Sequence, residues 1–257
     1  MTSPFPHLAS IRGQVAVVTG GTEGIGGGCA RRFSREGATV IALGRTAAKG
    51  EALIKELRAE SGDAHFFACD CADEQQVDST AKLILDRWGR VDILCNIAGG
   101  WREVPTIEEV TAKDMRHSFD WNIMSKLMIT QRLVPAMKAN NYGRIVMMSS
   151  TSGRRARMNS AIQYSTMQTG VIGLTRRLAV ELAPFGITVN AIAPGTTLTP
   201  RAGRHSAERL AATARGIPVG RLGTEDELAH AIWYLCTPGA GFTVGAVLDV
   251  NGGVWTG

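Results

Sequence analysis

A cluster of glycines near the N-terminus has the composition and position of a phosphate-binding loop. It reads Thr19-Gly20-Gly21-Thr22-Glu23-Gly24-Ile25-Gly26 and lies between an apolar segment and a segment with helical periodicity. Glycines let the main chain turn tightly and approach a ligand, and the start of a helix offers N–H groups and a positive dipole end. A structural turn is the alternative, but this context favours binding of a dinucleotide pyrophosphate. The residues expected to contact the cofactor here are Gly20, Thr22, Glu23, Gly24, Ile25 and Gly26.

The choice between NAD and NADP is expected to depend on Leu43-Gly44-Arg45-Thr46, about 20 residues beyond the loop. A carboxylate in this segment would bind the ribose hydroxyls and favour NAD, but the segment contains none. Arg45 can instead pair with a 2′-phosphate through its planar guanidinium. Glu23 in the phosphate loop argues against NADP, and a solvated arginine is the other interpretation of Arg45. Taken together, the residues favour NADP(H) over NAD(H).

Further cofactor contacts are expected where the next two apolar segments end. Asp70, followed by Cys71, can accept a hydrogen bond from the adenine amino group. Asn96-Ile97-Ala98-Gly99 would bring main chain beside the adenine ribose. We therefore add Asp70, Cys71, Asn96, Ala98 and Gly99 to the predicted cofactor site.

Alternating strand and helix patterns position these residues. Continuous apolar runs such as Val-Ala-Val-Val at 15–18 are typical of strands covered by helices on both faces. The alternation predicts an α/β fold: a Rossmann-type doubly wound parallel sheet of about seven strands with helices on both faces. Without a linker or repeat, residues 1–257 form one predicted domain. Ligands of such sheets bind outside the carboxyl ends of the strands. The predicted strands are 15–19, 39–43, 64–69, 91–96, 144–149, 188–192 and 246–250, and the predicted helical segments are 24–36, 47–60, 74–88, 112–139, 162–183 and 225–236.

Composition excludes several other classes of protein. The net charge is +5, but the lysines and arginines are dispersed, so we expect no nucleic-acid partner. The five cysteines lack metal-binding spacing, so we expect no metal site and interpret them as small buried side chains in a reducing cytoplasm. We find no apolar run of membrane-spanning length and no secretory signal, which predicts a cytoplasmic protein without a membrane partner.

The chain resembles the short-chain dehydrogenase/reductase family over nearly its whole length. The motifs that carry the resemblance are the glycine loop, Asn96-Ile97-Ala98-Gly99, Asn122, Ser149-Ser150-x-x-Gly153, Tyr164, Asn190-Ala191-Ile192-Ala193-Pro194-Gly195, Gly220-Arg221-Leu222-Gly223, Gly245 and Asn251-Gly252-Gly253.

The resemblance implies a role for each member of the catalytic set. Tyr164 would be the general acid/base, Ser150 would bind the substrate oxygen and Asn122 would hold a water. The choice of Ser150 over Ser149 rests on its spacing to Gly153. The family's lysine, four residues after the tyrosine, is here Gln168. The resemblance also implies that Pro194, Gly195, Thr197 and Thr199 contact the nicotinamide and that the chain forms a homotetramer.

Gln168 changes the chemistry available to Tyr164. The two residues are neighbours on one helix face, where a lysine would lower the phenol pKa by roughly 1–3 units. With glutamine the pKa should lie near 10, so only about one molecule in a thousand carries phenolate at pH 7. Ketone reduction, which uses the neutral phenol, is then favoured over alcohol oxidation, and the Gln168 amide can still hold ribose hydroxyls. A disabling substitution, another proton route, and a non-redox or sensing role all remain open.

Segments after the later strands are expected to frame the substrate. Trp101, Arg102, Ser152, Arg154 and Arg157 are the predicted contacts, with a lid at 196–218 that carries further arginines. Arginines on two sides of a cleft can clamp a carboxylate or phosphate, and a tryptophan suits a ring; solvated arginines are the alternative. The predicted function is an NAD(P)(H)-dependent oxidoreductase, a carbonyl reductase or secondary alcohol dehydrogenase acting on a small substrate. The alternatives are a dinucleotide sensor, a lyase or an isomerase on the same fold.

Overall fold

The computed structural model describes residues 8–101, 106–156 and 160–257. Its centre is a sheet of seven parallel strands in the order β3-β2-β1-β4-β5-β6-β7, which confirms the predicted fold class. The chain order reverses between β1 and β4, the switch point at which such sheets bind ligands. The strands are β1 (Val15–Thr19), β2 (Thr39–Gly44), β3 (Ala64–Ala68), β4 (Ile93–Asn96), β5 (Gly143–Met148), β6 (Ile187–Pro194) and β7 (Val247–Val250).

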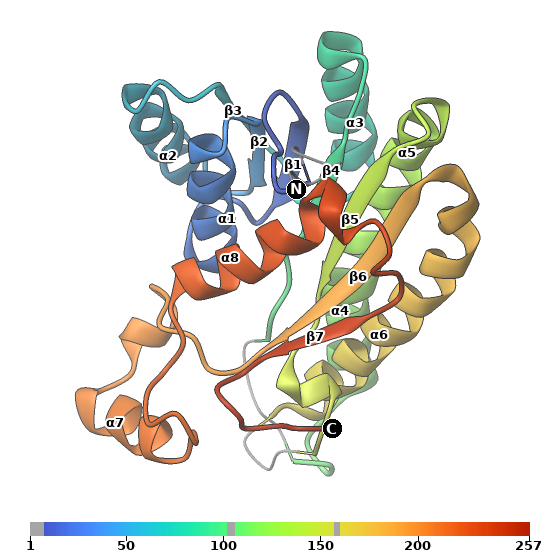
Figure 1. Ribbon diagram of the computed structural model, residues 1–257. Coiled ribbons are helices and arrows are strands. Elements are labelled where there is room, and N and C mark those ends of the chain that lie inside the picture. The colour runs from blue at the N-terminus through green and yellow to red at the C-terminus, as the bar shows by residue number, and fades with distance from the viewer. Residues whose placement is uncertain (1–7, 102–105, 157–159) are drawn as a thin grey trace, which may run out of the picture.

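Helices cover both faces of the sheet (Figure 1). Ala16 and Val18 of β1 pack toward one helical layer, while Val15 and Val17 pack toward the other. The first layer consists of α1 (Gly24–Arg35), α2 (Ala47–Ala59) and α8 (Glu225–Cys236); the second consists of α3 (Glu74–Trp88), α5 (Ser125–Ala139) and α6 (Ile162–Leu182). In the described ranges, no helix has the length and apolar character needed to cross a bilayer.

The segment predicted as one helix over 112–139 is divided into three parts. It comprises α4 (Ala112–Phe119), a π-helical turn (Asp120–Met124) and α5. The Ser118 carbonyl, which an α-helix would pair with the N–H of residue 122, accepts a hydrogen bond from the Asn122 side chain at 3.0 Å. This side-chain bond competes with the α-helical pattern, and π-turns of this kind often occur at functional sites.

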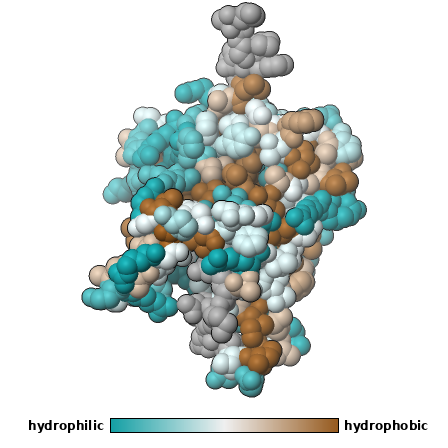
Figure 2. All heavy atoms as spheres, turned by 60° about the horizontal axis from the view of Figure 1, so that its bottom comes forward, coloured by the Kyte–Doolittle hydropathy of each residue, from teal (hydrophilic) through white to brown (hydrophobic). Residues whose placement is uncertain are grey.

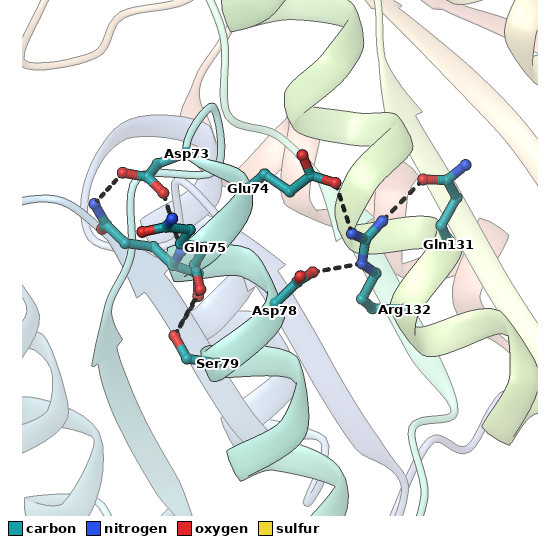
Figure 3. A network of polar contacts seen from close by, with 8 residues as sticks. Asp73, Glu74, Gln75, Asp78, Ser79, Gln131 and Arg132 are labelled. Carbon is teal, nitrogen blue, oxygen red and sulfur yellow. Dashed lines mark hydrogen bonds and ion pairs between the residues drawn. The ribbon is translucent and has the colours of Figure 1, made fainter.

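A network of ion pairs joins α3 to α5 (Figure 3). The Arg132 guanidinium of α5 contacts the carboxylates of Glu74 at 2.9 Å and Asp78 at 2.6 Å, and it also donates to Gln131. Single surface ion pairs contribute little, but one guanidinium between two carboxylates makes a network. The network holds α5 against α3, and α5 follows directly on the turn that carries Asn122.

Candidate functional site

The predicted cofactor and catalytic residues meet at the carboxyl ends of the strands. The C-terminus and α7 (Ala207–Arg215) lie on the lower side of Figure 1, at this edge of the sheet. Figure 2 turns that side forward and shows hydrophobic residues near the middle of the face, with hydrophilic residues around them.

The glycine loop has the geometry that a phosphate group requires. Gly20 and Gly24 have φ values of +63° and +59°, a region that favours glycine. A Cβ on Gly26 would lie 2.1 Å from the Gly20 carbonyl oxygen, so no larger residue fits this turn. Glu23, at the start of α1, makes no side-chain hydrogen bond to the first turn of the helix. The main chain here therefore fits the pyrophosphate of a dinucleotide.

Charged side chains on the adenosine side are arranged in two pairs. Lys49 of α2 forms an ion pair with Glu23 at 2.5 Å. The pair offsets the negative charge of Glu23, which would otherwise repel a phosphate near this loop. Arg45 lies 3.7 Å from Asp70 and 5.9 Å from the centre of the Trp121 ring. Arg45 and Asp70 thus lie together, where one can contact a phosphate and the other an amino group.

Buried polar side chains hold the segment that follows β4. The Thr19 hydroxyl accepts hydrogen bonds from the N–H groups of Ile97 and Ala98 at 3.0 and 3.1 Å. Asn96 itself points inward and donates to Thr130 at 3.0 Å. The Asn96 side chain therefore positions the loop, while the main chain of Ala98 and Gly99 lies nearer the surface.

Asn122 connects this loop to α6. Its Oδ1 accepts hydrogen bonds from the Gly100 N–H at 2.9 Å and from Gln168 Nε2 at 3.1 Å. Its Nδ2 donates to the Gly100 carbonyl at 3.0 Å. Both ends of the Asn122 amide thus bind protein groups, and these bonds position Gly100 and Gln168.

Tyr164 and Gln168 are both buried on α6, one helical turn apart. Gln168 Oε1 is buried and, among the described residues, has no hydrogen-bond partner. Such an acceptor suits a donor from a ligand, since buried polar atoms are usually paired. This unpaired oxygen fits a ribose hydroxyl of the cofactor.

The two candidate serines have different surroundings. The Ser149 hydroxyl is buried and donates to the Gln168 carbonyl at 2.9 Å. The Ser150 oxygen accepts a hydrogen bond from the Ser152 N–H at 3.1 Å, and Ser150 is only half-buried. The Ser150 O–H is therefore better placed to meet a ligand than that of Ser149, and buried Ser152 supports it through the main chain.

An aromatic and a cationic residue adjoin Tyr164. The Trp101 ring lies 4.4 Å from the Tyr164 ring, and the Arg201 guanidinium lies 4.5 Å from the Trp101 ring centre. Arg201 also donates to the Trp101 carbonyl. Burial lowers the pKa of Arg201, and the nearby Tyr164 hydroxyl partly opposes this effect. A cation and a flat ring thus meet beside the candidate acid/base.

The other predicted substrate residues are placed differently. Arg154 pairs with Asp249 at 3.0 Å and bonds to the Gly257 carbonyl, so binding of a substrate anion by Arg154 stays a prediction. Arg102 and Arg157 lie outside the described residues.

Residues after β6 meet the cofactor loop. The Gly195 N–H donates to the Val250 carbonyl directly after Pro194, and the Thr197 hydroxyl donates to the Gly195 carbonyl. Thr199 lies 3.6 Å from the position of a Gly24 Cβ. Two predicted cofactor contacts that are far apart in sequence are therefore neighbours.

Sequence reasoning missed Lys126. Its side chain is only 1% exposed, and its Nζ donates to the Ala98 carbonyl at 2.6 Å. Burial lowers the pKa of Lys126 to about 8. The available signal was spacing, because Lys126 follows Asn122 by four residues and so shares its side of the helical segment. Within the described residues, no group of three His, Cys, Asp or Glu side chains could hold a metal ion.

Known proteins resemble this chain along nearly its full length. A family model described as enoyl-(acyl carrier protein) reductase matches residues 20–255. The short-chain reductase protein NovJ of Streptomyces niveus is 33% identical, with 98% of this chain and 99% of NovJ covered. The 2,3-dihydroxy-2,3-dihydro-p-cumate dehydrogenase of Pseudomonas putida is 36% identical, with 98% of each chain covered. A structure of a variant actinorhodin polyketide ketoreductase with NADPH has a TM-score of 0.90 and 31% identity, covering 94% of this chain and 97% of that one. The chain therefore belongs to the short-chain dehydrogenase/reductase family of oxidoreductases.

Proposed function

We propose that the protein is an NADP(H)-dependent carbonyl reductase or secondary alcohol dehydrogenase. The observation that carries this proposal is the meeting of Tyr164, Ser150 and the Asn122–Gln168 pair beside a glycine loop that fits a pyrophosphate. When bound, the nicotinamide would supply or accept the hydride at the substrate carbon. Everything else in the reaction falls to side chains of this chain.

In reduction, the Tyr164 phenol donates its proton to the substrate oxygen. The Ser150 O–H donates a hydrogen bond to the same oxygen, since its own oxygen already accepts one from Ser152. Oriented donors of this kind stabilise the negative charge that develops on the oxygen. Gln168 takes the place of the family's lysine in this proposal, and its unpaired Oε1 accepts a hydrogen bond from a ribose hydroxyl.

The preference for NADP(H) rests on charge. Arg45 directly follows β2, where a 2′-phosphate is expected, and Lys49 pairs with Glu23 and offsets its charge. The ketoreductase neighbour was solved with NADPH, which is consistent with this choice. Asp70 competes for Arg45, but at 3.7 Å the pair is loose and exposed, so a phosphate can displace it.

The proposed substrate is a small carbonyl or hydroxyl compound with a ring and a negative charge. Trp101 offers a flat surface and Arg201 a cation, both beside Tyr164. The p-cumate relative is named for a molecule with a ring and a carboxylate. Arg201 belongs to the proposed lid at 196–218, so this segment would supply the cation that binds the substrate anion.

The test is the change in nicotinamide absorbance with NADPH or NADH and a matched panel of ketones. The panel pairs cyclic with linear ketones, and carboxylated with neutral ones. We expect turnover with NADPH that is greatest for cyclic carboxylates and abolished by Tyr164→Phe. NADPH binding without turnover over the whole panel would favour the sensing or non-redox alternative.

A further inference from the structure

Lys126 is a buried cation that the proposed reaction leaves without a task. Its Nζ bonds to one main-chain oxygen, that of Ala98. Among the described residues, the ionisable group that acts on it is the Cys71 thiol, not a carboxylate. Burying an ammonium group without a counter-ion is unfavourable, and such groups often occur at functional sites.

The Lys126 ammonium lies beside the group that anchors Gln168. A Cβ built on Gly99 would lie 3.2 Å from Lys126 Nζ and 2.8 Å from Asn122 Oδ1, so both atoms approach the same point. Asn122 Oδ1 in turn accepts the Gln168 Nε2–H at 3.1 Å. One neutral side chain therefore separates the ammonium from the position where the family's motif has its lysine.

The charge also fixes the orientation of the two amides. A nearby ammonium favours the carbonyl end of an amide, and Asn122 Oδ1 already accepts a hydrogen bond from the Gly100 N–H. Gln168 must then present its N–H to Asn122 and its Oε1 to the ligand side, as observed. If either amide reversed, two acceptors or two donors would face each other.

We propose that Lys126 supplies the positive charge that Gln168 lacks and acts through the Asn122–Gln168 pair as a positioning residue for Tyr164. The proposal rests on the proposed function, because it assigns Tyr164 the proton transfer. The positive charge that the family's motif places on α6 would here come from Lys126 on α5. Its field favours the phenolate of Tyr164, and by linkage the phenolate favours the charged lysine.

The pH range of this effect follows from the groups around Lys126. Asn122 and Gln168 are neutral and Cys71 is a buried thiol, so none of them fixes the lysine charge. The ammonium is the main form at pH 7, and its field weakens as pH rises through about 8. Arg201, which contacts the Trp101 ring, is a separate cation and needs its own control.

The first test measures the ionisation of Tyr164 without any turnover. The chain has three tyrosines, so the ultraviolet absorbance of phenolate against pH, minus that of Tyr164→Phe, isolates this residue. Because Lys126 is charged mainly below about pH 8, the comparison is made at pH 7–8, where we expect Lys126→Met to lower the phenolate fraction of Tyr164 by about threefold to tenfold. Lys126→Gln keeps a donor without the charge and should behave like Lys126→Met. Lys138→Met on the same helix and Arg201→Gln are the controls: Lys138→Met leaves the titration unchanged, and the effect of Lys126→Met persists in Arg201→Gln.

An unchanged phenolate fraction of Tyr164 at pH 7–8 in both folded Lys126 variants would overturn the proposal. Parental behaviour of Lys126→Gln would also overturn it, because the hydrogen bond to Ala98 would then suffice. Failure of the proposed function looks different: the ketone panel is then inert while the titration still shifts.

The second test moves the charge back. Lys126→Met should lower the rate of alcohol oxidation at pH 7 by about threefold to tenfold, with little change in the Kd for NADPH. Adding Gln168→Lys to Lys126→Met should restore the rate, whereas Gln168→Lys alone should give a smaller gain. A rise in Kd for NADPH with an unchanged rate would instead make Lys126 a cofactor-binding residue and refute the positioning role.

Discussion

Replacement of Asn122 by alanine tests whether this side chain organises the site. The substitution removes the partners of three buried groups: the Gly100 N–H, the Gly100 C=O and the Gln168 Nε2–H, held at 2.9, 3.0 and 3.1 Å. Each unpaired buried group costs about 1–3 kcal/mol, so the loss for the three groups is roughly 3–9 kcal/mol. Relaxation of the π-helical turn can return about 1 kcal/mol, because the Ser118 carbonyl would regain an N–H donor. A net loss of about 2–8 kcal/mol follows.

The assay is urea unfolding of Asn122→Ala against the parent, with the rate of ketone reduction measured on the folded fraction. Asn190→Ala is the matched control: Asn190 is a buried asparagine of β6 with two main-chain partners, outside the site. Both variants should lose stability, but only Asn122→Ala should also lose activity. Parental stability in Asn122→Ala, or an equal loss of activity in the two variants, would show that Asn122 does not organise the site.

Three further predictions concern charge. Arg45→Ala should raise the KM for NADPH by about tenfold or more and leave that for NADH nearly unchanged, and a parallel rise for both would remove Arg45 from the 2′-phosphate site. Burial lowers the pKa of Lys126 from its unfolded value to about 8, so the buried charged form reduces the stability of the folded protein below pH 8. This loss of stability disappears as pH rises from about 8 toward the unfolded pKa. Lys126→Met should therefore be more stable than the parent at pH 7, with a gap that narrows as pH rises from about 8 to 10, as thermal unfolding at several pH values will measure. Arg221 lowers the pKa of Glu227 to about 2, so the stability this carboxylate contributes is present above its unfolded pKa and lost as pH falls toward 2. Glu227→Gln should reduce the loss of unfolding free energy as pH falls through that range. The same pH dependence in Glu227→Gln and the parent would contradict a stabilising ion pair.

The elements most accurately predicted from sequence are those whose ends carry their own local signals. The segment 74–88 matches α3 because Asp73 caps its start and Gly89, at φ +68°, ends it. The segment 225–236 matches α8, where Thr224 and Glu227 form a capping box. Such signals depend only on residues a few positions apart, so they can be recognised from the sequence alone.

The features that sequence did not predict depend on contacts between distant residues. Asn122 in the π-helical turn bonds to Gly100, 22 positions away. Arg154 pairs with Asp249, which lies 95 positions further along the chain, and the sequence did not predict this pair; binding of a substrate anion by Arg154 stays a prediction. Periodicity identifies the elements, whereas these pairings depend on how the elements pack.

The position of Thr199 beside Gly24 has a kinetic consequence for the proposed lid at 196–218. Because this segment begins near the phosphate loop, its closure over a substrate would block cofactor exchange. We therefore expect ordered kinetics in which the dinucleotide binds first and leaves last. Release of the oxidised cofactor, which requires the lid to open again, would then limit the turnover rate. Product inhibition by the oxidised cofactor would be competitive with NADPH.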